Sequence, residues 1–575
     1  MHLSTKLFLS IHLVSCLLLA DEMNVQKTLS QLTLEQKIGQ LFVIPAVSSS
    51  EINKEFMAHE PYTMDEIYVK QMIQEYQPGG VIFLGAGFVQ QQFDLTQEFQ
   101  ALSQMPLLIC QDAEWGLSMR LRDGFRFPHN MALGALSQEH EHVIYDMGYE
   151  IGKQCKALGV HMNLAPVVDV NNNPKNPIIN DRSFGQDKEN VARKAQLYMR
   201  GLRDAGIIAC AKHFPGHGDT AIDSHYDLPR IVHTRARLDD VELYPFKKMI
   251  DAGIQAIMTA HLEIPALDAT PNCPSSLSHN VVTNLLKDEL GFDGVVITDG
   301  LGMRGITKHH TLGELELKSL LAGHDILLCP VDLPKAVATI KQAVLDGRLT
   351  EAELDKKVLK ILALKAWANV GHIPAHLDTE QLHSEQAQAL KQKLYAHALT
   401  VARDDEKLIT RLQEQNQLQV IEIGQQNSVF LDEVRNVLLL VRPEGRTLGP
   451  NLKDQSEKKL ASYHLAPDAD DAAMKKIIDQ LPDNEPIVIA LLGMTRFAKQ
   501  KFGISDATQK FLHMQQQAGK ESLVIVFGNA YSLPLIKDAD SVIVAYEDDV
   551  DAQKAAAQLL AGKLQATGIP PVRSE

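Results

Sequence analysis

Short apolar runs recur between residues 40 and 330 of this chain, and segments with a helical period separate them. The runs with the length and composition of buried strands are Leu41–Ile44, Gly80–Leu84, Pro106–Cys110, Val160–Val168, Gly206–Ala211, Gln255–Ala260, Val295–Thr298 and Asp325–Cys329. The amphipathic stretches between them include Glu139–Ala157, Asn190–Ala205, Asp239–Asp251 and Asn280–Leu290. Strands that alternate with helices form parallel sheets, and eight such units predict a closed (β/α)8 TIM-like barrel. A doubly wound sheet is disfavoured because no glycine-rich phosphate turn follows the first run.

A second, smaller α/β layered domain is predicted after the barrel. Lys335–Leu345 and Glu351–Val370 have the pattern of closing helices, and a further helix is expected to end near Arg403. The later apolar runs that read as strands are Val437–Val441, Ile487–Leu492, Leu523–Phe527 and Ser541–Ala545. We therefore expect the catalytic barrel over residues 21–380, a linker helix over 381–403 and the C-terminal α/β domain over 404–575.

The amino terminus has the pattern of an export signal. Lys6 precedes an apolar run from Leu7 to Ala20, and acidic residues follow. This run is short for a membrane span and fits the apolar core of a signal peptide over residues 1–20, so we expect a periplasmic or secreted protein. Leu13-Val14-Ser15-Cys16 also satisfies a lipoprotein cleavage box, so cleavage after Ala20 and a lipid anchor at Cys16 stay as alternatives.

The composition of the chain limits the classes of partner that it is expected to bind. Apolar residues make up 45% and charged residues 22% of the 575 residues, as in soluble globular proteins. A formal charge of -16 argues against nucleic acid, because phosphate binding needs a basic surface. The six cysteines show no C-x-x-C spacing, so we expect neither a disulfide framework nor a metal site, and no cofactor.

The segment KHFPGHGDTAIDSH, Lys212 to His225, directly follows the fifth run. It holds three histidines, two aspartates and a lysine within fourteen residues. A buried parallel strand has no structural need for such residues, whereas an α/β active site places them at the carboxyl end of a strand. The segment is therefore predicted to be an active-site loop.

Other polar residues follow other predicted strands. They are Asp112, Glu114, Trp115 and Arg120 after the third run, Asp169, Asp181 and Arg182 after the fourth, His261 after the sixth, and Asp299 after the seventh. In a barrel these ends meet at one mouth, and converging donors and acceptors suit the hydroxyls of a sugar. Asp169 and Asp181 fit ion pairs that orient loops equally well. His261 has no assigned role, and Trp115 fits both ring stacking and packing under its loop.

Lys212–His225 is similar to the active-site loop of the bacterial β-N-acetylglucosaminidases of glycoside hydrolase family 3, whose pattern is Lys-His-Phe-Pro-Gly-His-Gly followed by Asp-Ser-His. The resemblance implies a nucleophile at Asp299, in a Thr/Ser-Asp-x-Leu/Met-x-Met pattern, and His225 with Asp223 as the general acid and its partner. It further implies sugar binding by Asp112, Arg120, Arg182, Lys212 and His213. The chain departs from relatives at Gly300, where a second acidic residue is frequent, and at Trp115 and Leu117 within the pattern Glu-Gly-Gly-Arg.

The residues themselves support these roles. Retaining glycoside hydrolysis needs one carboxylate nucleophile and one acid for the leaving oxygen. Asp299 follows a rigid apolar strand. Asp223 and His225 point the same way in extended chain, so the carboxylate fixes the imidazole tautomer and raises its basicity. His217 lies between glycines and is expected to structure the loop.

Together with this chemistry, the resemblance implies an exo-acting retaining β-N-acetylglucosaminidase that acts on peptidoglycan-derived or related amino-sugar glycans. A family 3 β-glucosidase or a glycoside phosphorylase is the alternative within this fold. A catalytically inactive, glycan-binding barrel is the alternative from another functional class. The region after residue 404 is expected to contribute stability or solubility rather than catalytic groups.

Overall fold

The chain divides into two compact units. The computed structural model describes residues 24–221, 228–308, 310–404, 407–415, 417–440, 459–483 and 485–573. The first unit comprises the chain up to Arg126, Tyr145–Asp169 and Ala195–Ser384, and the second comprises Phe127–Ile144, Val170–Lys194 and the chain from Glu385 onward. Two segments from the barrel half of the sequence thus belong to the second unit. The boundaries drawn from the sequence at 380 and 403 stay predictions.

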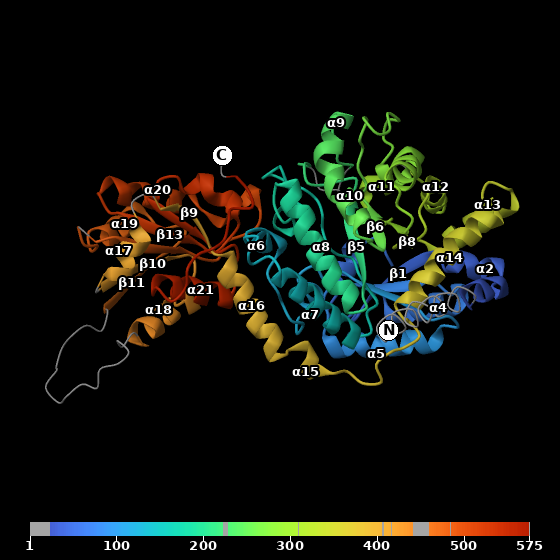
Figure 1. The fold of residues 1–575 in the computed structure, drawn as a ribbon, viewed down its shortest axis with the longest axis horizontal. Coiled ribbons are helices and arrows are strands. Elements are labelled where there is room, and N and C mark those ends of the chain that lie inside the picture. The colour runs from blue at the N-terminus through green and yellow to red at the C-terminus, as the bar shows by residue number, and fades with distance from the viewer. Residues whose placement is uncertain are drawn as a thin grey trace, which may run out of the picture. The chain divides into compact units, whose positions relative to one another are not determined.

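The first unit contains a parallel barrel (Figure 1). Its strands are β1 (Phe42–Val47), β2 (Gly80–Leu84), β3 (Leu108–Gln111), β4 (Met162–Asn163), β5 (Ile208–Phe214), β6 (Ala256–Thr259), β7 (Val295–Thr298) and β8 (Leu327–Leu328). Neighbours pair in the order β7-β6-β5-β4-β3-β2-β1-β8. A parallel bridge between Ile297 and Ile326 joins the two ends of this order. The predicted (β/α)8 fold is confirmed.

The fourth strand is much shorter than the predicted run Val160–Val168. Regular pairing ends at Asn163. Beyond it, single backbone hydrogen bonds join this segment to β5, from Cys210 N–H to Ala165 O and from Lys212 N–H to Pro166 O, together with an isolated bridge from Val167 to Lys212. This early end of β4 leaves the chain near Asp169 as loop beside the end of β5.

Helices follow the strands along the barrel half of the sequence. They are α2 (Leu34–Gly39), α3 (Lys54–His59), α4 (Glu66–Tyr76), α5 (Val89–Leu102), α6 (Asn130–Gly134), α7 (Val143–Ala157), α8 (Lys188–Asp204), α9 (Arg235–Arg237), α10 (Leu243–Asp251), α11 (Arg304–Thr307), α12 (Glu314–Ala322), α13 (Leu333–Leu345), α14 (Glu351–Trp367) and α15 (Thr379–Leu382). Of these, α6 and the first residues of α7 and α8 belong to the second unit. A π-helix over Leu238–Glu242 leads into α10, and a π-helix over Asn280–Glu289 forms the helix that the sequence predicts there. No helix among the described residues combines the length and apolarity needed to cross a membrane.

The second unit contains a six-stranded mixed sheet with helices on both faces. Its elements are α16 (Glu385–Ala398), β9 (Thr400–Asp404), α17 (Leu408–Glu414), β10 (Gln417–Ile423), α18 (Val429–Leu440), β11 (Lys459–Leu465), α19 (Asp471–Ile478), β12 (Ile487–Leu491), α20 (Asp506–Gln517), β13 (Ser522–Val526), β14 (Ser541–Val544) and α21 (Val550–Leu560). The strand order is β11-β10-β12-β13-β14-β9, with β9 antiparallel to β14. Alternate residues of β12 enter two separate apolar cores, one under α18 and α21 and one under α19 and α20. This confirms the predicted second α/β domain.

Several elements of this unit differ from the sequence-based expectation. The run Val437–Val441 was predicted as a strand, but its described part lies in α18. Phe430, Val434 and Val437 are buried at helical spacing, and a short apolar run does not distinguish a buried helix from a strand. The helix expected to reach Arg403 ends at Ala398, and β9 follows it. Strands β9, β10 and β11 were not predicted, because their polar residues interrupt the apolar pattern.

A buried lysine lies under the barrel. Lys365 of α14 is 4% exposed, and its ammonium donates hydrogen bonds to Gln40 Oε1 at 2.7 Å and Pro106 O at 2.8 Å. Burial lowers the pKa of Lys365 to about 7. The unfolded chain therefore binds more protons than the folded one between pH 7 and the ordinary lysine pKa, and stability should rise with pH over that range.

We predict that the free energy of unfolding of the wild type rises relative to that of Lys365→Met between pH 7 and pH 10, by up to about 1.4 kcal/mol per pH unit. Urea unfolding at several pH values measures this difference. The matched control is Lys356→Met, which changes an exposed lysine of the same helix. A pH-independent difference for Lys365→Met would show that the folded protein does not depress this pKa.

Candidate active site

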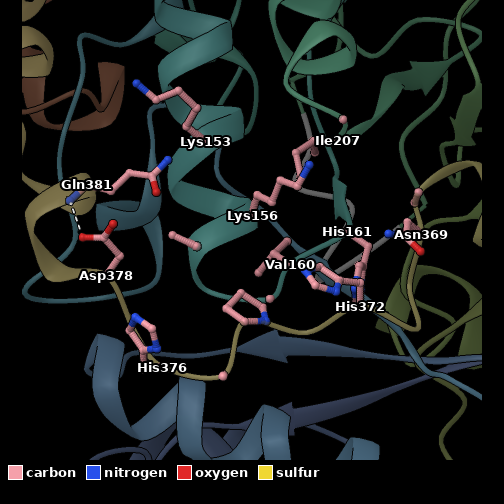
Figure 2. A pocket seen from close by; sticks show the side chains of 16 residues that line it. Lys153, Lys156, Val160, His161, Ile207, Asn369, His372, His376, Asp378 and Gln381 are labelled. Carbon is pink, nitrogen blue, oxygen red and sulfur yellow. Dashed lines mark hydrogen bonds between the residues drawn. The ribbon is translucent and has the colours of Figure 1, made fainter.

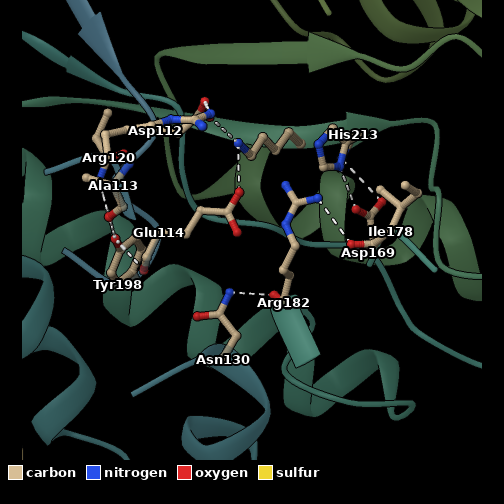
Figure 3. A network of polar contacts seen from close by, with 12 residues as sticks. Asp112, Ala113, Glu114, Arg120, Asn130, Asp169, Ile178, Arg182, Tyr198 and His213 are labelled. Carbon is tan, nitrogen blue, oxygen red and sulfur yellow. Dashed lines mark hydrogen bonds and ion pairs between the residues drawn. The ribbon is translucent and has the colours of Figure 1, made fainter. Parts of the chain in front are cut away.

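A buried ammonium at the carboxyl end of β5 lies between two carboxylates. Lys212 Nζ is 2.8 Å from Asp112 Oδ1 and 2.9 Å from Glu114 Oε1. The side chains of Lys212 and Glu114 are only 3% and 1% exposed. Both carboxylates follow β3, and Tyr198 lies beneath them with its hydroxyl donating to Ala113 O and Glu114 O (Figure 3). These two ion pairs connect the carboxyl ends of β3 and β5.

Arg120 adds a second cation to this group. Its guanidinium donates to Asp112 Oδ2 in a short hydrogen bond, and the two side chains lie together in Figure 3. Burial alone would raise the pKa of Asp112, but the Lys212 ammonium and the Arg120 guanidinium outweigh it and hold the pKa well below its usual range. Asp112 is therefore an anion at any pH at which the protein is expected to work. The structure brings together three of the five predicted sugar-binding residues.

His213 is held by Asp169. Its Nδ1 lies 2.8 Å from Asp169 Oδ2, while Asp169 Oδ1 accepts the backbone N–H groups of His213 at 3.2 Å and His217 at 2.7 Å (Figure 3). Burial raises the pKa of Asp169, but His213 and His217 lower it by more, so the pKa lies below its ordinary value. An ionised Asp169 accepts from Nδ1–H, which makes Nε2 the ring nitrogen directed away from it. Asp169 thus orients the active-site loop, as one sequence interpretation predicted.

His217 has the predicted structural role. It is 2% exposed, and its Nδ1 lies 2.9 Å from Thr220 Oγ1. Burial and the neighbouring His213 lower its pKa to about 4. A neutral, buried imidazole bound within its own loop fits loop structuring better than proton transfer to a substrate.

Asp299 follows β7 directly, and its backbone N–H donates to Thr259 O at 3.0 Å. Its Oδ1 accepts the N–H of Gly300 at 2.8 Å. The next residues are held by three neighbouring elements: Leu301 N–H donates to Leu328 O, Gly302 N–H donates to the Tyr62 hydroxyl, and Gly300 O contacts His261. The carboxylate therefore stands on a backbone fixed from several sides.

The hydrogen bonds of His261 define its tautomer. Its Nε2 lies 3.1 Å from Gly300 O, which only accepts, so Nε2 carries the proton. Its Nδ1 lies 2.6 Å from Ser276 Oγ, which can donate to it. His261 is 1% exposed. The histidine left unassigned by the sequence therefore holds the carbonyl of Gly300, the residue after Asp299.

Asp112 follows β3 and Asp299 follows β7, so both residues lie at the carboxyl end of the parallel barrel. Cys329, which directly follows β8, is buried, and burial raises the pKa of its thiol well above the usual value. The Asp299 and Asp112 carboxylates both raise it further, so the thiol lies within electrostatic reach of both. Cys329 is thus a neutral core residue.

The other predicted site residues lie elsewhere. Asp223 and His225 fall in residues 222–227, which lie outside the described residues. The amino-terminal segment with Cys16 lies outside them as well. Arg182 belongs to the second unit, where its guanidinium donates to Ile178 O and its own carbonyl accepts from Asn130. Nearby Asp181 pairs with Arg496 at 2.7 Å and His129 at 3.3 Å, which confirms its predicted place in an ion pair.

Two contributors to the site were missed. The sequence places Glu114 after the third run but assigns it no role of its own, and in the structure it neutralises Lys212 together with Asp112. Tyr62 follows β1, and its hydroxyl would lie 2.9 Å from a Cβ at position 300, so any side chain there would crowd it. This contact accounts for a glycine at 300, and no local sequence pattern signals it. Within the described ranges, no cluster of three or more His, Cys, Asp or Glu side chains is arranged to hold a metal ion.

Comparison with known proteins places this site in a family. The model of the glycosyl hydrolase family 3 N terminal domain matches residues 33–364. Beta-hexosaminidase A of Pseudoalteromonas piscicida is 28% identical over 553 residues, covering 88% of this chain and 90% of that protein. A beta-hexosaminidase of Thiobacillus denitrificans is 37% identical over 257 residues, which cover 44% of this chain and 70% of that protein.

A solved structure agrees with these relatives. The glycoside hydrolase family 3 β-N-acetylglucosaminidase from Paenibacillus sp. str. FPU-7 superposes with a TM-score of 0.73 at 28% identity. The superposition covers 94% of this chain and 99% of that one. The family model spans the whole barrel, including Asp112, Lys212 and Asp299. This chain belongs to glycoside hydrolase family 3.

Proposed function

We propose that this protein is an exo-acting, retaining β-N-acetylglucosaminidase that releases terminal N-acetylglucosamine from peptidoglycan-derived or related glycans. The observation that carries the proposal is the carboxylate Asp299 at the same barrel mouth as the ionised Asp112, Lys212 and Arg120 group. Relatives that cover most of this chain are named beta-hexosaminidase A and β-N-acetylglucosaminidase. The loop Lys212–His225 carries the Asp-Ser-His pattern that the β-glucosidase alternative does not explain.

The charged group suits the terminal sugar. Asp112 is a buried anion that accepts hydroxyl hydrogens, while Lys212 and Arg120 donate from fixed positions. Their mutual neutralisation keeps the cost of burying each charge low before substrate arrives. His213, held through Nδ1 by Asp169, offers Nε2 to a further hydroxyl. Arg182 is assigned to the same sugar by its position in the sequence pattern.

Asp299 supplies the nucleophile in this proposal. Its carboxylate attacks the anomeric carbon while the glycosidic oxygen departs, giving a glycosyl ester on Asp299. His225, oriented by Asp223, gives its proton to the departing oxygen and then takes a proton from the water that hydrolyses the ester. Two displacements at one carbon return the original configuration. Rigid support from Tyr62 and His261 keeps Asp299 aligned through both steps.

Export is part of the proposal. The run from Leu7 to Ala20 supports a signal peptide, and the box ending in Cys16 supports the lipid-anchored alternative. Intact-mass measurement of the protein recovered from the envelope of an expressing bacterium distinguishes an amino terminus at Asp21 from a lipidated Cys16. An uncleaved chain in the cytoplasm would contradict export.

The substrate assignment predicts that aryl β-N-acetylglucosaminides are hydrolysed with a much higher kcat/KM than the matching aryl β-glucosides. Parallel chromogenic assays of the full chain measure both. Equal rates would favour the β-glucosidase alternative, and no turnover of either would favour the glycan-binding barrel. Turnover that requires added phosphate and yields a sugar phosphate would favour the phosphorylase.

If His225 is the general acid, the loss of activity on its removal should depend on the leaving group of the substrate. His225→Ala should slow hydrolysis of the phenyl β-N-acetylglucosaminide by about 10²–10⁴-fold but that of the dinitrophenyl one much less, since a good leaving group departs without a proton. Asp223→Ala should act in the same direction more weakly, because the ring loses its orientation but keeps its nitrogens. Steady-state kinetics over the series give both values.

The chain offers a matched control for this experiment. His233 Nε2 lies 2.8 Å from Asp219 Oδ2, so it forms another histidine–aspartate pair close in sequence to the loop. His233→Ala should slow all leaving groups alike or none. A loss confined to poor leaving groups in His233→Ala, and not in His225→Ala, would move the acid to His233.

A further inference from the structure

The second sheet holds a segment from the barrel half of the sequence at the carboxyl ends of its strands. β12, β13 and β14 are parallel to one another, so their carboxyl ends lie at the same edge of the sheet. Open α/β sheets bind their ligands at this edge. Here the residues that follow the strands contact Asn171, Asn180 and Asp181, which belong to the same compact unit. Arg182, a proposed sugar-binding residue, is the next residue in the chain.

Two side chains after β13 fix the backbone of this segment. The Tyr531 hydroxyl donates to Asn171 O at 2.6 Å and accepts from Asn171 Nδ2 at 2.8 Å. Asn529 Nδ2 donates to Asn180 Oδ1 in a short hydrogen bond. Asn180 is 2% exposed and has a φ of 44°, a left-handed conformation that asparagine adopts more readily than most residues. The turn that leads into Arg182 is thus held by residues of the C-terminal domain.

Arg496, which follows β12, makes the contact nearest to the Arg182 side chain. One nitrogen of its guanidinium lies 2.7 Å from Asp181 Oδ1 in an ion pair and donates to Ile178 O at 3.4 Å. The Arg182 guanidinium donates to the same Ile178 carbonyl at 3.3 Å (Figure 3). Burial raises the pKa of the Asp181 carboxyl, but neighbouring cationic side chains, both arginines among them, lower it by more. The ionised Asp181 therefore allows two guanidinium groups to share one acceptor.

A residue after β14 supports Asp181 from its other oxygen. His129 Nδ1 lies 3.3 Å from Asp181 Oδ2, and the backbone N–H of His129 donates to Glu547 Oε1 at 2.6 Å. Glu547 is 8% exposed and comes shortly after β14. Each oxygen of Asp181 therefore has a partner that is anchored in the C-terminal sheet, one through Arg496 and one through His129.

The cavity of the first unit is separate from these contacts. It measures about 380 Å³ and lies where Val160 and Ile207 precede β4 and β5, at the end of the barrel opposite to the proposed site (Figure 2). The hydrogen bond drawn there joins the N–H of Gln381 to Asp378 Oδ1 at 3.1 Å and caps α15. All residues that line the cavity belong to the first unit, whereas Arg496 belongs to the second.

From these contacts we propose that Arg496 is a positioning residue for substrate binding and that it acts through Arg182. This rests on the proposed function, in which Arg182 binds the terminal sugar. Arg496 fixes the Asp181 carboxylate and the Ile178 carbonyl. These two groups in turn keep the Arg182 guanidinium in the conformation from which it donates to a sugar hydroxyl. The C-terminal domain thus contributes to substrate affinity, which goes beyond the role in stability expected from the sequence.

A double-mutant cycle in the full chain tests whether the two arginines act together, with the aryl glycoside that the wild type hydrolyses fastest as substrate. Arg182→Gln should lower kcat/KM by about 10–100-fold, because it removes a charge-assisted hydrogen bond to the sugar. Arg496→Gln should lower it by about fivefold or more, mainly through a higher KM and equally for good and poor leaving groups. The double variant should lose no more than Arg182→Gln alone, since Arg496 acts through that side chain.

Two further variants control for general damage to the domain. Arg411→Gln removes another arginine ion pair of the C-terminal domain, to Glu521 at 2.6 Å, and should leave kcat/KM unchanged. Arg496→Lys should recover most of the activity, because a single guanidinium nitrogen makes both contacts and an ammonium can replace it. Urea unfolding of each variant measures whether the fold is retained.

Losses that multiply in the double variant would overturn the proposal, and so would an unchanged KM in Arg496→Gln or a loss that Arg496→Lys does not recover. An unchanged kcat/KM in Arg182→Gln would remove that residue from the sugar site and overturn it as well. Hydrolysis of β-glucosides alone by the wild type would contradict the proposed function, while the cycle on that substrate would still decide the role of Arg496. Absence of any turnover by the wild type would overturn both.

Discussion

The active site depends on neutralising one buried cation. Lys212 is almost fully buried at the end of β5, and it is stable there because Asp112 and Glu114 both lie within 2.9 Å of it. Removal of one partner from a buried ion pair typically costs about 3–5 kcal/mol, since the other charge stays behind. β3 and β5 can therefore end only in a geometry that brings these three charges together. The same geometry fixes Asp112 and Arg120 where a sugar hydroxyl can meet them.

A second set of constraints fixes the chain after β7. Asp299 lies between a strand that is fully buried and a turn held by Tyr62, His261 and Leu328. These hydrogen bonds come from Leu328 of β8, from His261 after β6 and from Tyr62 in the loop before α4, so the closed barrel fixes the backbone around the proposed nucleophile. A carboxylate held in this way suits the nucleophile of the proposed mechanism, in which a different residue supplies the acid.

Much of this arrangement can be predicted from the pattern of residues. The rest cannot, and the reasons are physical. Continuous apolar runs such as Val295–Thr298 identified the barrel strands, because strands buried on both faces need few polar residues. The helix containing Val437 was mistaken for a strand, since a short apolar run fits either structure. Asp112 and Lys212 were predicted from motifs, whereas Tyr62 acts through a contact with Gly302, 240 residues away, that no local pattern encodes.

The central claim is that the Asp299 carboxylate is the nucleophile of a retaining N-acetylglucosaminidase. Inactivation with a 5-fluoro N-acetylglucosaminyl fluoride followed by peptide mass mapping tests it most directly, because the reagent traps the glycosyl ester that the mechanism requires. The account predicts one sugar per chain, attached to the peptide that contains Asp299, and no labelling of Asp299→Ala. Attachment to another carboxylate, or labelling that survives in Asp299→Ala, would contradict it.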